Sequence, residues 1–170
     1  MSRHQDSYNR NKKGSGFTLI EALVALAIVT VGLIPAFVEA TNALNLASSI
    51  QNSLIATHLA QEGVEVVRAM RDDDWFAGAP FGTTLDACAN GCRVQWNSAA
   101  VLPAADVALN RDPTSGIFSY DTGTATGFKR SLTITAVSAH ERKVVVTVTW
   151  HDRTGAKQFQ LEDHLYDWLK

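Results

Sequence analysis

The residues with the clearest chemistry lie at the start of a long apolar run. Gly16 follows a basic pair, Lys12 and Lys13, and it opens the sequence Gly-Phe-Thr-Leu-Ile-Glu, which ends at Glu21. Glycine has no side chain, so an extended backbone at Gly16 is open to close approach by another molecule. Glu21 is the one charge inside the apolar run that follows. An unpaired charge is costly in apolar surroundings, so the Glu21 carboxylate is expected to need a partner of opposite charge.

The two cysteines are the next candidates. Cys88 and Cys92 flank Ala89-Asn90-Gly91, a turn-forming sequence, and they are the only cysteines in the chain. Thiols are oxidised outside the cytoplasm, so a disulfide that closes a small loop is favoured over two free thiols if this region is exported. Zinc needs more ligands than this pair supplies, and a redox pair would normally have two intervening residues before a helix.

The remaining polar clusters do not form a recognisable reaction site. Asp72-Asp73-Asp74 could attract Ca²⁺, but adjacent side chains diverge and no spaced ligand loop follows, so a solvated helix end is favoured. The spacing of four scattered histidines indicates neither a metal site nor a catalytic base: His58, His140, His151 and His164. We therefore expect no catalytic site, no metal and no cofactor.

The apolar run that contains Glu21 is long enough to form a membrane helix. Over residues 22–38, only Thr30, Gly32 and Pro35 interrupt the apolar side chains. With residues 17–20 included, the run reaches the roughly 20 residues that cross a bilayer core as a helix. Pro35 lacks an N–H and Gly32 adds backbone freedom, so we expect a flex point there, at the least a simple kink.

Charge indicates the orientation of this helix. Residues 1–16 hold four basic residues and one acidic residue, a net charge of +3, and residues 17–170 hold eleven basic and sixteen acidic residues, a net charge of −5. By the positive-inside rule the basic leader stays in the cytoplasm and the acidic remainder is exported. A secretory signal peptide is the alternative, but its cleavage site would follow the apolar run, whereas Gly16 precedes it. The acidic remainder also argues against a nucleic-acid ligand.

The stretch from Gly16 to Glu21 resembles the processing site of type IV prepilins and of the related type II secretion pseudopilins. The resemblance implies that an intramembrane prepilin peptidase cuts between Gly16 and Phe17 and methylates the new amine, and that Glu21 acts in assembly. The new Phe17 amine would be mostly cationic at neutral pH, and the Glu21 carboxylate could neutralise it, within one chain or between neighbours. It also implies that the stretch bracketed by Gly32 and Pro35 can unwind when subunits pack into a filament. The resemblance covers about a quarter of the chain. An ordinary signal anchor with an incidental glutamate is the alternative.

Beyond the apolar run, the sequence predicts that the same helix continues. Apolar residues recur at helical spacing, so one helix is expected over residues 17–71, with an amphipathic half at 39–71. Trp75 and Phe76 should pin the end of this helix to the following domain. The positions expected to face that domain are Leu44, Ala47, Ile50 or Gln51, Leu54, Ile55, His58, Leu59, Glu62, Val66 and Met70.

The sequence of residues 72–170 predicts a loop-rich region followed by an antiparallel sheet. Turn-forming residues dominate up to residue 127, and strict alternation then predicts long strands. We expect three or four strands laid over the helix, with Trp168 capping the core. The fold class is therefore α+β, a long N-terminal helix packed on a small antiparallel sheet, as in pilins. The candidate strands are 93–96, 117–120, one with Leu132, Ile134 and Ala136 on one face, one with Val144, Val146, Val148 and Trp150 on one face, and 158–162.

Together these features predict a type IV pilin-like structural subunit of an extracellular or periplasm-spanning filament. The expected plan is a cytoplasmic leader at 1–16, a transmembrane or filament-core helix half at 17–38, an amphipathic half at 39–71 and an exported head at 72–170. The expected partners are prepilin peptidase, other pilin subunits, and the inner membrane with its pilus assembly platform. A minor pilin of the pilus modification type in a cell-surface pilus is favoured. A type II secretion pseudopilin of a periplasmic pseudopilus and a pilus-tip adhesion module are the alternatives.

Overall fold

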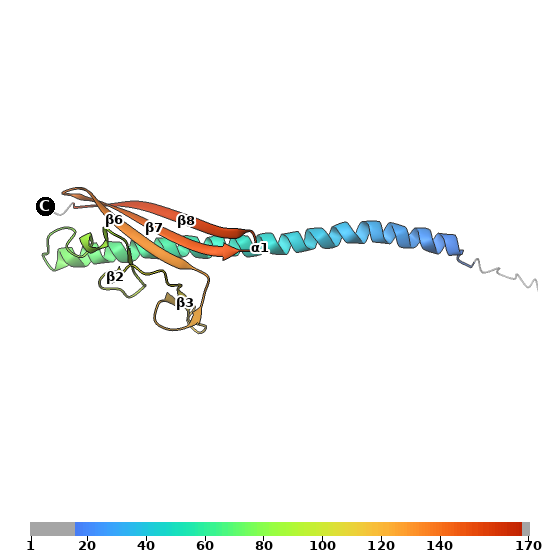
Figure 1. Cartoon of the computed structure of the whole chain (residues 1–170), viewed down its shortest axis with the longest axis horizontal. Coiled ribbons are helices and arrows are strands. Elements are labelled where there is room, and N and C mark those ends of the chain that lie inside the picture. The colour runs from blue at the N-terminus through green and yellow to red at the C-terminus, as the bar shows by residue number, and fades with distance from the viewer. Residues whose placement is uncertain (1–15, 168–170) are drawn as a thin grey trace, which may run out of the picture. The chain divides into compact units, whose positions relative to one another are not determined.

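The computed structural model describes residues 16–167 (Figure 1). The chain divides into two compact units, Met1–Leu46 and Ala47–Lys170. Helix α1 (Leu19–Phe76) begins in the first unit, and the second unit holds the rest of α1 and all of the strands. The α+β class and the long N-terminal helix predicted from the sequence are confirmed.

Helix α1 ends later than the sequence predicted. We expected the three aspartates to end it after Arg71, but the helix continues through them to Phe76. The residues after Phe76 close the helix, and among them Gly78 has a φ of 69°. The Gly78 N–H donates to the Trp75 carbonyl, and the Ala79 N–H donates to the Asp74 carbonyl. These two bonds form a Schellman motif, in which glycine takes the left-handed position. The aspartates do not stop the helix because their propensity cost is small beside the packing of α1 on the sheet.

The second unit is built on a five-stranded antiparallel sheet in the order β2-β1-β6-β7-β8. Three strands are long: β6 (Lys129–Ser138), β7 (Glu141–Asp152) and β8 (Gly155–Tyr166). The other two have two residues each: β1 (Cys92–Arg93) and β2 (Leu102–Pro103). The sheet has more strands than the expected three or four, because two-residue strands are too short to show an alternating pattern.

A second, smaller sheet and a short helix occupy the loop-rich region. Strands β3 (Asn110–Arg111), β4 (Phe118–Ser119) and β5 (Thr124–Ala125) pair in the order β4-β3-β5. The 3₁₀ helix η1 (Asp86–Cys88) precedes β1 in the chain. Candidate strands 93–96 and 117–120 thus correspond to the short strands β1 and β4, and each was predicted too long.

The long strands follow the predicted alternation. Leu132 and Ile134 in β6 are buried, as are Val144, Val146, Val148 and Trp150 in β7. Ala136, which was expected on the same face, is exposed. The returning strand predicted at 158–162 is longer than expected, because β8 pairs with β7 without interruption from Gly155 to Tyr166. Backbone pairing therefore extends well beyond the apolar part of the pattern.

The helix face that packs on the sheet differs in part from the predicted one. Leu44, Ile50 and Leu54 were expected to face the head, but all three are more than half exposed. A sheet packs closely on a helix only where short side chains let the backbones approach. A Cβ added at Gly63 would lie only 3.1 Å from Cγ1 of Val146, so Gly63 marks the closest approach. The buried residues of α1 are Ala56, Leu59, Ala60, Gly63, Val64, Val66, Val67 and Met70.

At the end of α1, Trp75 is partly buried whereas Phe76 is exposed, and the pinning of this end by Trp75 stays a prediction. Trp75 is partly buried, and the Arg71 guanidinium lies 4.6 Å from its ring centroid. Phe76 is 93% exposed, so the expectation for this residue was wrong. Consecutive helical residues point about 100° apart at 3.6 residues per turn, so the two side chains point in different directions. Trp168, the expected core cap, lies outside the described residues.

Candidate functional site in the N-terminal segment

Helix α1 begins with a capped turn that positions Glu21. The Glu21 N–H donates to Thr18 Oγ1 (3.3 Å), and the Ala22 N–H donates to the Thr18 carbonyl (3.1 Å). Thr18 is therefore the N-cap and Glu21 the third helical residue, which is the spacing of a capping box. A carboxylate in the first turn is also favoured by the positive end of the helix dipole. The spacing of Thr18 and Glu21 in the sequence Thr-Leu-Ile-Glu is the signal that could have predicted this cap.

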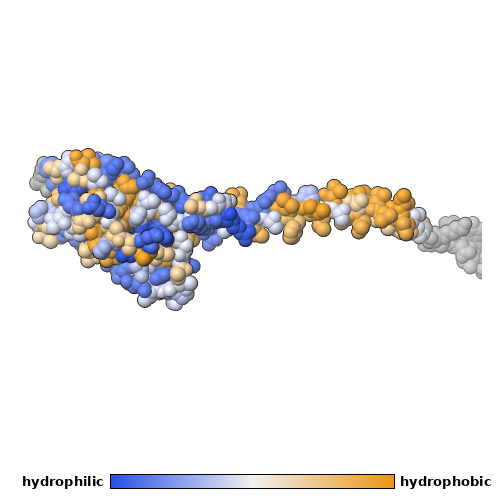
Figure 2. Space-filling view, viewed as in Figure 1, coloured by the Kyte–Doolittle hydropathy of each residue, from blue (hydrophilic) through white to orange (hydrophobic). Residues whose placement is uncertain are grey.

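The helix that follows presents apolar side chains on all sides. Figure 2 shows hydrophobic residues along the N-terminal part of α1. Each large apolar residue from Phe17 to Val38 is between 48% and 81% exposed. Within residues 16–167, α1 is the one helix that is long and apolar enough to cross a membrane, by length and composition. Because exposing apolar surface to water costs about 25 cal/mol per Å², this segment needs lipid or protein around it.

Polar groups inside the apolar segment are largely satisfied within it. The Thr30 hydroxyl donates to the Ala27 carbonyl (2.9 Å), so it needs no partner from outside the helix. Pro35 has no N–H, so the Val31 carbonyl lacks its usual helical donor. The helix is nevertheless continuous through Gly32 and Pro35. Their role as a flex point stays a prediction.

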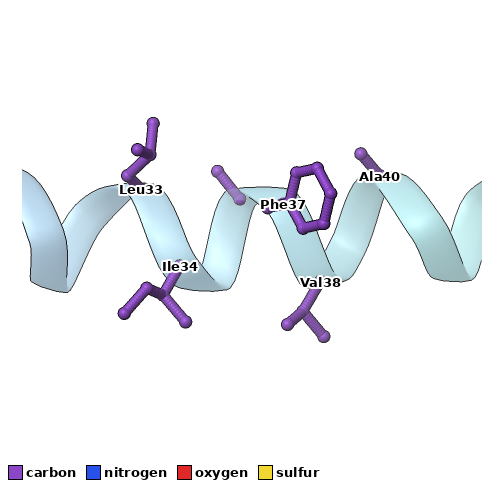
Figure 3. A pocket seen from close by; sticks show the side chains of 6 residues that line it. Leu33, Ile34, Phe37, Val38 and Ala40 are labelled. Atoms are coloured by element: carbon purple, nitrogen blue, oxygen red, sulfur yellow. The ribbon is translucent and has the colours of Figure 1, made fainter.

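A shallow apolar depression lies beside Pro35, lined by Leu33, Ile34, Ala36, Phe37, Val38 and Ala40 (Figure 3). In the close-up, Leu33 and Phe37 point to one side of the helix, whereas Ile34 and Val38 point to the other. This is the i to i+4 spacing of neighbours on a helix surface. The depression holds no polar side chain, so its chemistry suits apolar packing.

Comparison with known families identifies this segment. Residues 11–37 match the family described as the prokaryotic N-terminal methylation motif, which is the signal motif of type IV pilins and pseudopilins. The chain carries this signal motif. No curated protein and no solved structure matches the chain.

The pilin-type motif includes every residue of the segment to which the sequence analysis gave a role: Gly16, Phe17, Glu21, Gly32 and Pro35. The motif implies processing by prepilin peptidase and assembly with pilins. Members of the pilin family are structural subunits and are generally not enzymes. The individual roles of these five residues stay predictions.

In the second unit, Cys88 and Cys92 are joined by a disulfide. Both cysteines are buried, and Cys92 pairs with Leu132 of β6 and with Pro103 of β2. The disulfide therefore closes a five-residue ring whose two ends are both fixed in the core of the head.

A buried arginine ties the helix to the sheet. The Arg130 side chain is fully buried, and its Nη1 donates to the Leu59 carbonyl (2.7 Å) and to Glu62 Oε1 (3.0 Å). Its Nη2 donates to the Val94 carbonyl (2.6 Å). The Tyr120 hydroxyl donates to the Arg130 carbonyl (3.1 Å). One side chain of β6 thereby connects α1 and the residue after β1.

A second arginine closes the opposite end of the sheet. Arg142 of β7 donates from Nε (2.6 Å) and from Nη2 (3.1 Å) to the two carboxylate oxygens of Asp86, and from Nη1 to the Ser138 carbonyl (2.8 Å). The bonds to Asp86 raise the pKa of Arg142 above its ordinary value. This bidentate pair holds η1 against the β6–β7 turn.

The aspartates at 72–74 and the four histidines, considered above as possible metal ligands, do not gather at one site. Asp74 accepts bonds from the Thr84 N–H (3.0 Å) and hydroxyl (2.7 Å), so it anchors the following loop, whereas Asp73 is exposed. His164 lies between Glu141 (2.6 Å) and Glu162 (3.3 Å). In the described part of the chain, no group of three or more His, Cys, Asp or Glu side chains is arranged to hold a metal ion.

Proposed function

We propose that this chain is a structural subunit of a type IV pilus-type filament, incorporated as a minor pilin. The observation that carries the proposal is the match of the signal motif to residues 11–37. This stretch includes the start of a helix that is capped by Thr18 and has Glu21 in its first turn. The exposed apolar segment supports it, because such a surface needs either a bilayer or neighbouring apolar helices. The prepilin is cut between Gly16 and Phe17 and held in the inner membrane by residues 17–38, with its head exported.

Assembly then transfers the apolar segment from lipid to a bundle of neighbouring helices. The Phe17 amine of one subunit pairs with Glu21 of another, and this pairing selects the axial stagger between them. The selection arises because any stagger that leaves either charge unpaired in an apolar core is penalised. The segment with Gly32 and Pro35 accommodates changes in helix path during this transfer, since its backbone bonding is already incomplete.

The experiment that tests processing is the mass of the mature protein. Cells with active prepilin peptidase should yield a chain that begins at methylated Phe17. A Gly16→Val variant should accumulate as the full-length precursor, because a branched side chain blocks the close approach that glycine allows. Gly14→Val, two residues upstream, is the matched control and should be processed normally. A wild-type chain that keeps its first sixteen residues would overturn the proposal.

The place of the subunit in the filament is tested by its abundance. A minor pilin should be present in sheared cell-surface pili at far fewer copies than the principal subunit. Recovery only from the periplasm would favour a pseudopilus. Pili that assemble at normal length and number without this chain, but no longer adhere, would favour a tip module.

A further inference from the structure

The disulfide ring encloses a dipeptide with its own chemistry. Asn90-Gly91 is the only Asn-Gly pair in the chain, and Asn90 is exposed. In such a pair the glycine nitrogen can attack the asparagine side chain, because glycine has no Cβ to obstruct the approach. The attack requires that the Gly91 N–H be free and that the backbone rotate to bring this nitrogen to Asn90 Cγ.

In the closed ring, both requirements are opposed. The Gly91 N–H donates to the Cys88 carbonyl (3.1 Å), and Gly91 has a φ of 94°. Gly91 also lies close to the sheet. A Cβ added to it would be 3.8 Å from Cβ of Ala104 and 3.8 Å from the Leu132 carbonyl oxygen. Cys88 and Cys92 hold both ends of the ring in the core. The backbone therefore cannot rotate unless the ring opens.

We propose that Asn90 is a site of spontaneous deamidation that the Cys88–Cys92 disulfide controls, slow while the ring is closed and fast when it is open. The Gly91 nitrogen forms a bond to Asn90 Cγ, the bond from Cγ to Nδ2 breaks, and ammonia leaves with the proton of the Gly91 amide. Water then adds to either carbonyl of the succinimide, which gives aspartate or isoaspartate. The reaction consumes only water.

The modification therefore marks chains in which the disulfide has not formed. It places a new carboxylate on the exposed loop, and the isoaspartate product adds a methylene to the main chain between the cysteines. A ring of five residues fixed at both ends accommodates that insertion poorly, so modification disfavours closure. The inference concerns the head alone and does not depend on filament assembly.

The test compares the full chain in detergent with the disulfide intact and with the thiols reduced and alkylated. Both samples are incubated at mildly alkaline pH, and deamidation of each asparagine is followed by peptide mass spectrometry. Loss of the ring and of one restraining hydrogen bond should raise the Asn90 rate at least about fivefold. Asn97 is the internal control, because it is exposed and the following Ser98 N–H also donates to a carbonyl, that of Gln95 (2.9 Å).

Each outcome decides the proposal. Acceleration at Asn90 with an unchanged rate at Asn97 supports it, as does the same pattern in a Cys88→Ser/Cys92→Ser variant whose thermal unfolding remains cooperative. Equal Asn90 rates in the two samples, or no deamidation in either, would overturn it. A parallel rise at Asn97 would also overturn it, because reduction would then act by unfolding the head.

Discussion

At the scale of single residues, Arg130 and Glu21 both carry a charge in apolar surroundings, but they differ in how that charge is satisfied. Arg130 is buried in the head and meets carbonyls and a carboxylate of the same chain. Glu21 lies in the apolar segment and is exposed, and its backbone N–H donates to Thr18 Oγ1. Both terminal nitrogens of the first charge are satisfied within the subunit, whereas its buried Nε has no hydrogen-bond partner in the structure. The second is suited to a partner outside the subunit.

Substitution of Glu21 should separate assembly from anchoring. Glu21→Gln keeps the capping-box spacing, so the helix should start as before and cleavage at Gly16 should continue. Membrane insertion should be equal or better, because a charge has been removed from an apolar helix. Incorporation into filaments should fall, since a neighbour's amine loses its partner, and Glu21→Asp should restore little because its reach is shorter. The measurement is the ratio of sheared to membrane-bound subunit, and a wild-type ratio for Glu21→Gln would contradict the pairing.

Substitution of Arg130 should destabilise the head. Arg130→Met leaves the Val94 carbonyl and Glu62 without this donor and should cost about 2–3 kcal/mol of unfolding free energy. This is less than the roughly 3–5 kcal/mol expected when a fully buried pair is broken, because the Glu62 side chain is 32% exposed. Lys129→Met is the control, because Lys129 precedes Arg130 in β6 and makes only an exposed pair with Asp106. Equal urea midpoints for the two variants would mean that the Arg130 contacts contribute little.

Sequence reasoning identified the residues whose chemistry depends on neighbours along the chain. The Gly16 to Glu21 sequence and the Cys88 and Cys92 pair are short-range patterns of this kind. Arg130 was missed because an arginine in a strand is ordinarily read as solvent-facing, and its partners lie 36 to 71 residues away. Only the parity of β6, which places Arg130 on the same face as Leu132 and Ile134, could have indicated that it is buried.

At the scale of elements, the packing of α1 on the sheet depends on small residues. Gly63→Leu should destabilise the head by at least about 2 kcal/mol, because a larger side chain would collide with Val146, which is fully buried between two strands. Ala69→Leu, on an exposed position of the same helix, should change stability by less than about 0.5 kcal/mol. Thermal or urea unfolding of the two variants provides the measurement. A Gly63→Leu protein as stable as the control would show that the helix can move away from the sheet at little cost.

The end of the β7–β8 pair should respond to pH through His164. Its ring lies between two carboxylates, and the bonds to Glu141 and then Glu162 raise the pKa of His164 above its ordinary value of 6.5. The stabilisation is therefore fully present below pH 6.5 and is lost as pH rises through the raised pKa. The difference in melting temperature between wild type and His164→Gln should shrink across that interval. An NMR titration that places the His164 pKa at or below 6.5 would contradict the prediction, and Glu141→Gln should lower it.

The elements themselves were predictable to different degrees. The alternation in β6 and β7 is long and regular, so the apolar residues of their inward faces were identified apart from Ala136, which is exposed. The buried Arg130 and Arg142 on the same faces were not expected there. The face of α1 was assigned too near its N-terminal end, because Leu44, Ile50 and Leu54 have helical spacing whether they meet a sheet or another chain. The spacing of residues along a helix predicts that one face is apolar. How much of that face the head covers depends on the length of the strands, which the helix sequence does not contain.

At the scale of the whole molecule, every buried hydrophobic residue among residues 16–167 lies in the second unit, Ala47–Lys170. The described core begins at Ala56 and ends at Leu165, and no residue from Gly16 to Leu46 is buried. The head therefore has its own hydrophobic core, disulfide and ion pairs. The first unit contributes an apolar surface whose burial must come from lipid or from other chains.

A chain that begins at Ala47 should therefore fold without the first unit. It keeps the whole core and the Ser49 contact with Asp152 (3.4 Å), so it should be soluble without detergent, form the disulfide and unfold cooperatively. A chain that begins at Gln61 loses Ala56, Leu59 and Ala60, and with them the Leu59 carbonyl that Arg130 binds, so it should not fold. Calorimetry and non-reducing peptide mapping of the two chains make the comparison. If the chain from Ala47 aggregated or melted without a cooperative transition, the head would depend on the apolar segment, and the division of labour between the two units would have to be abandoned.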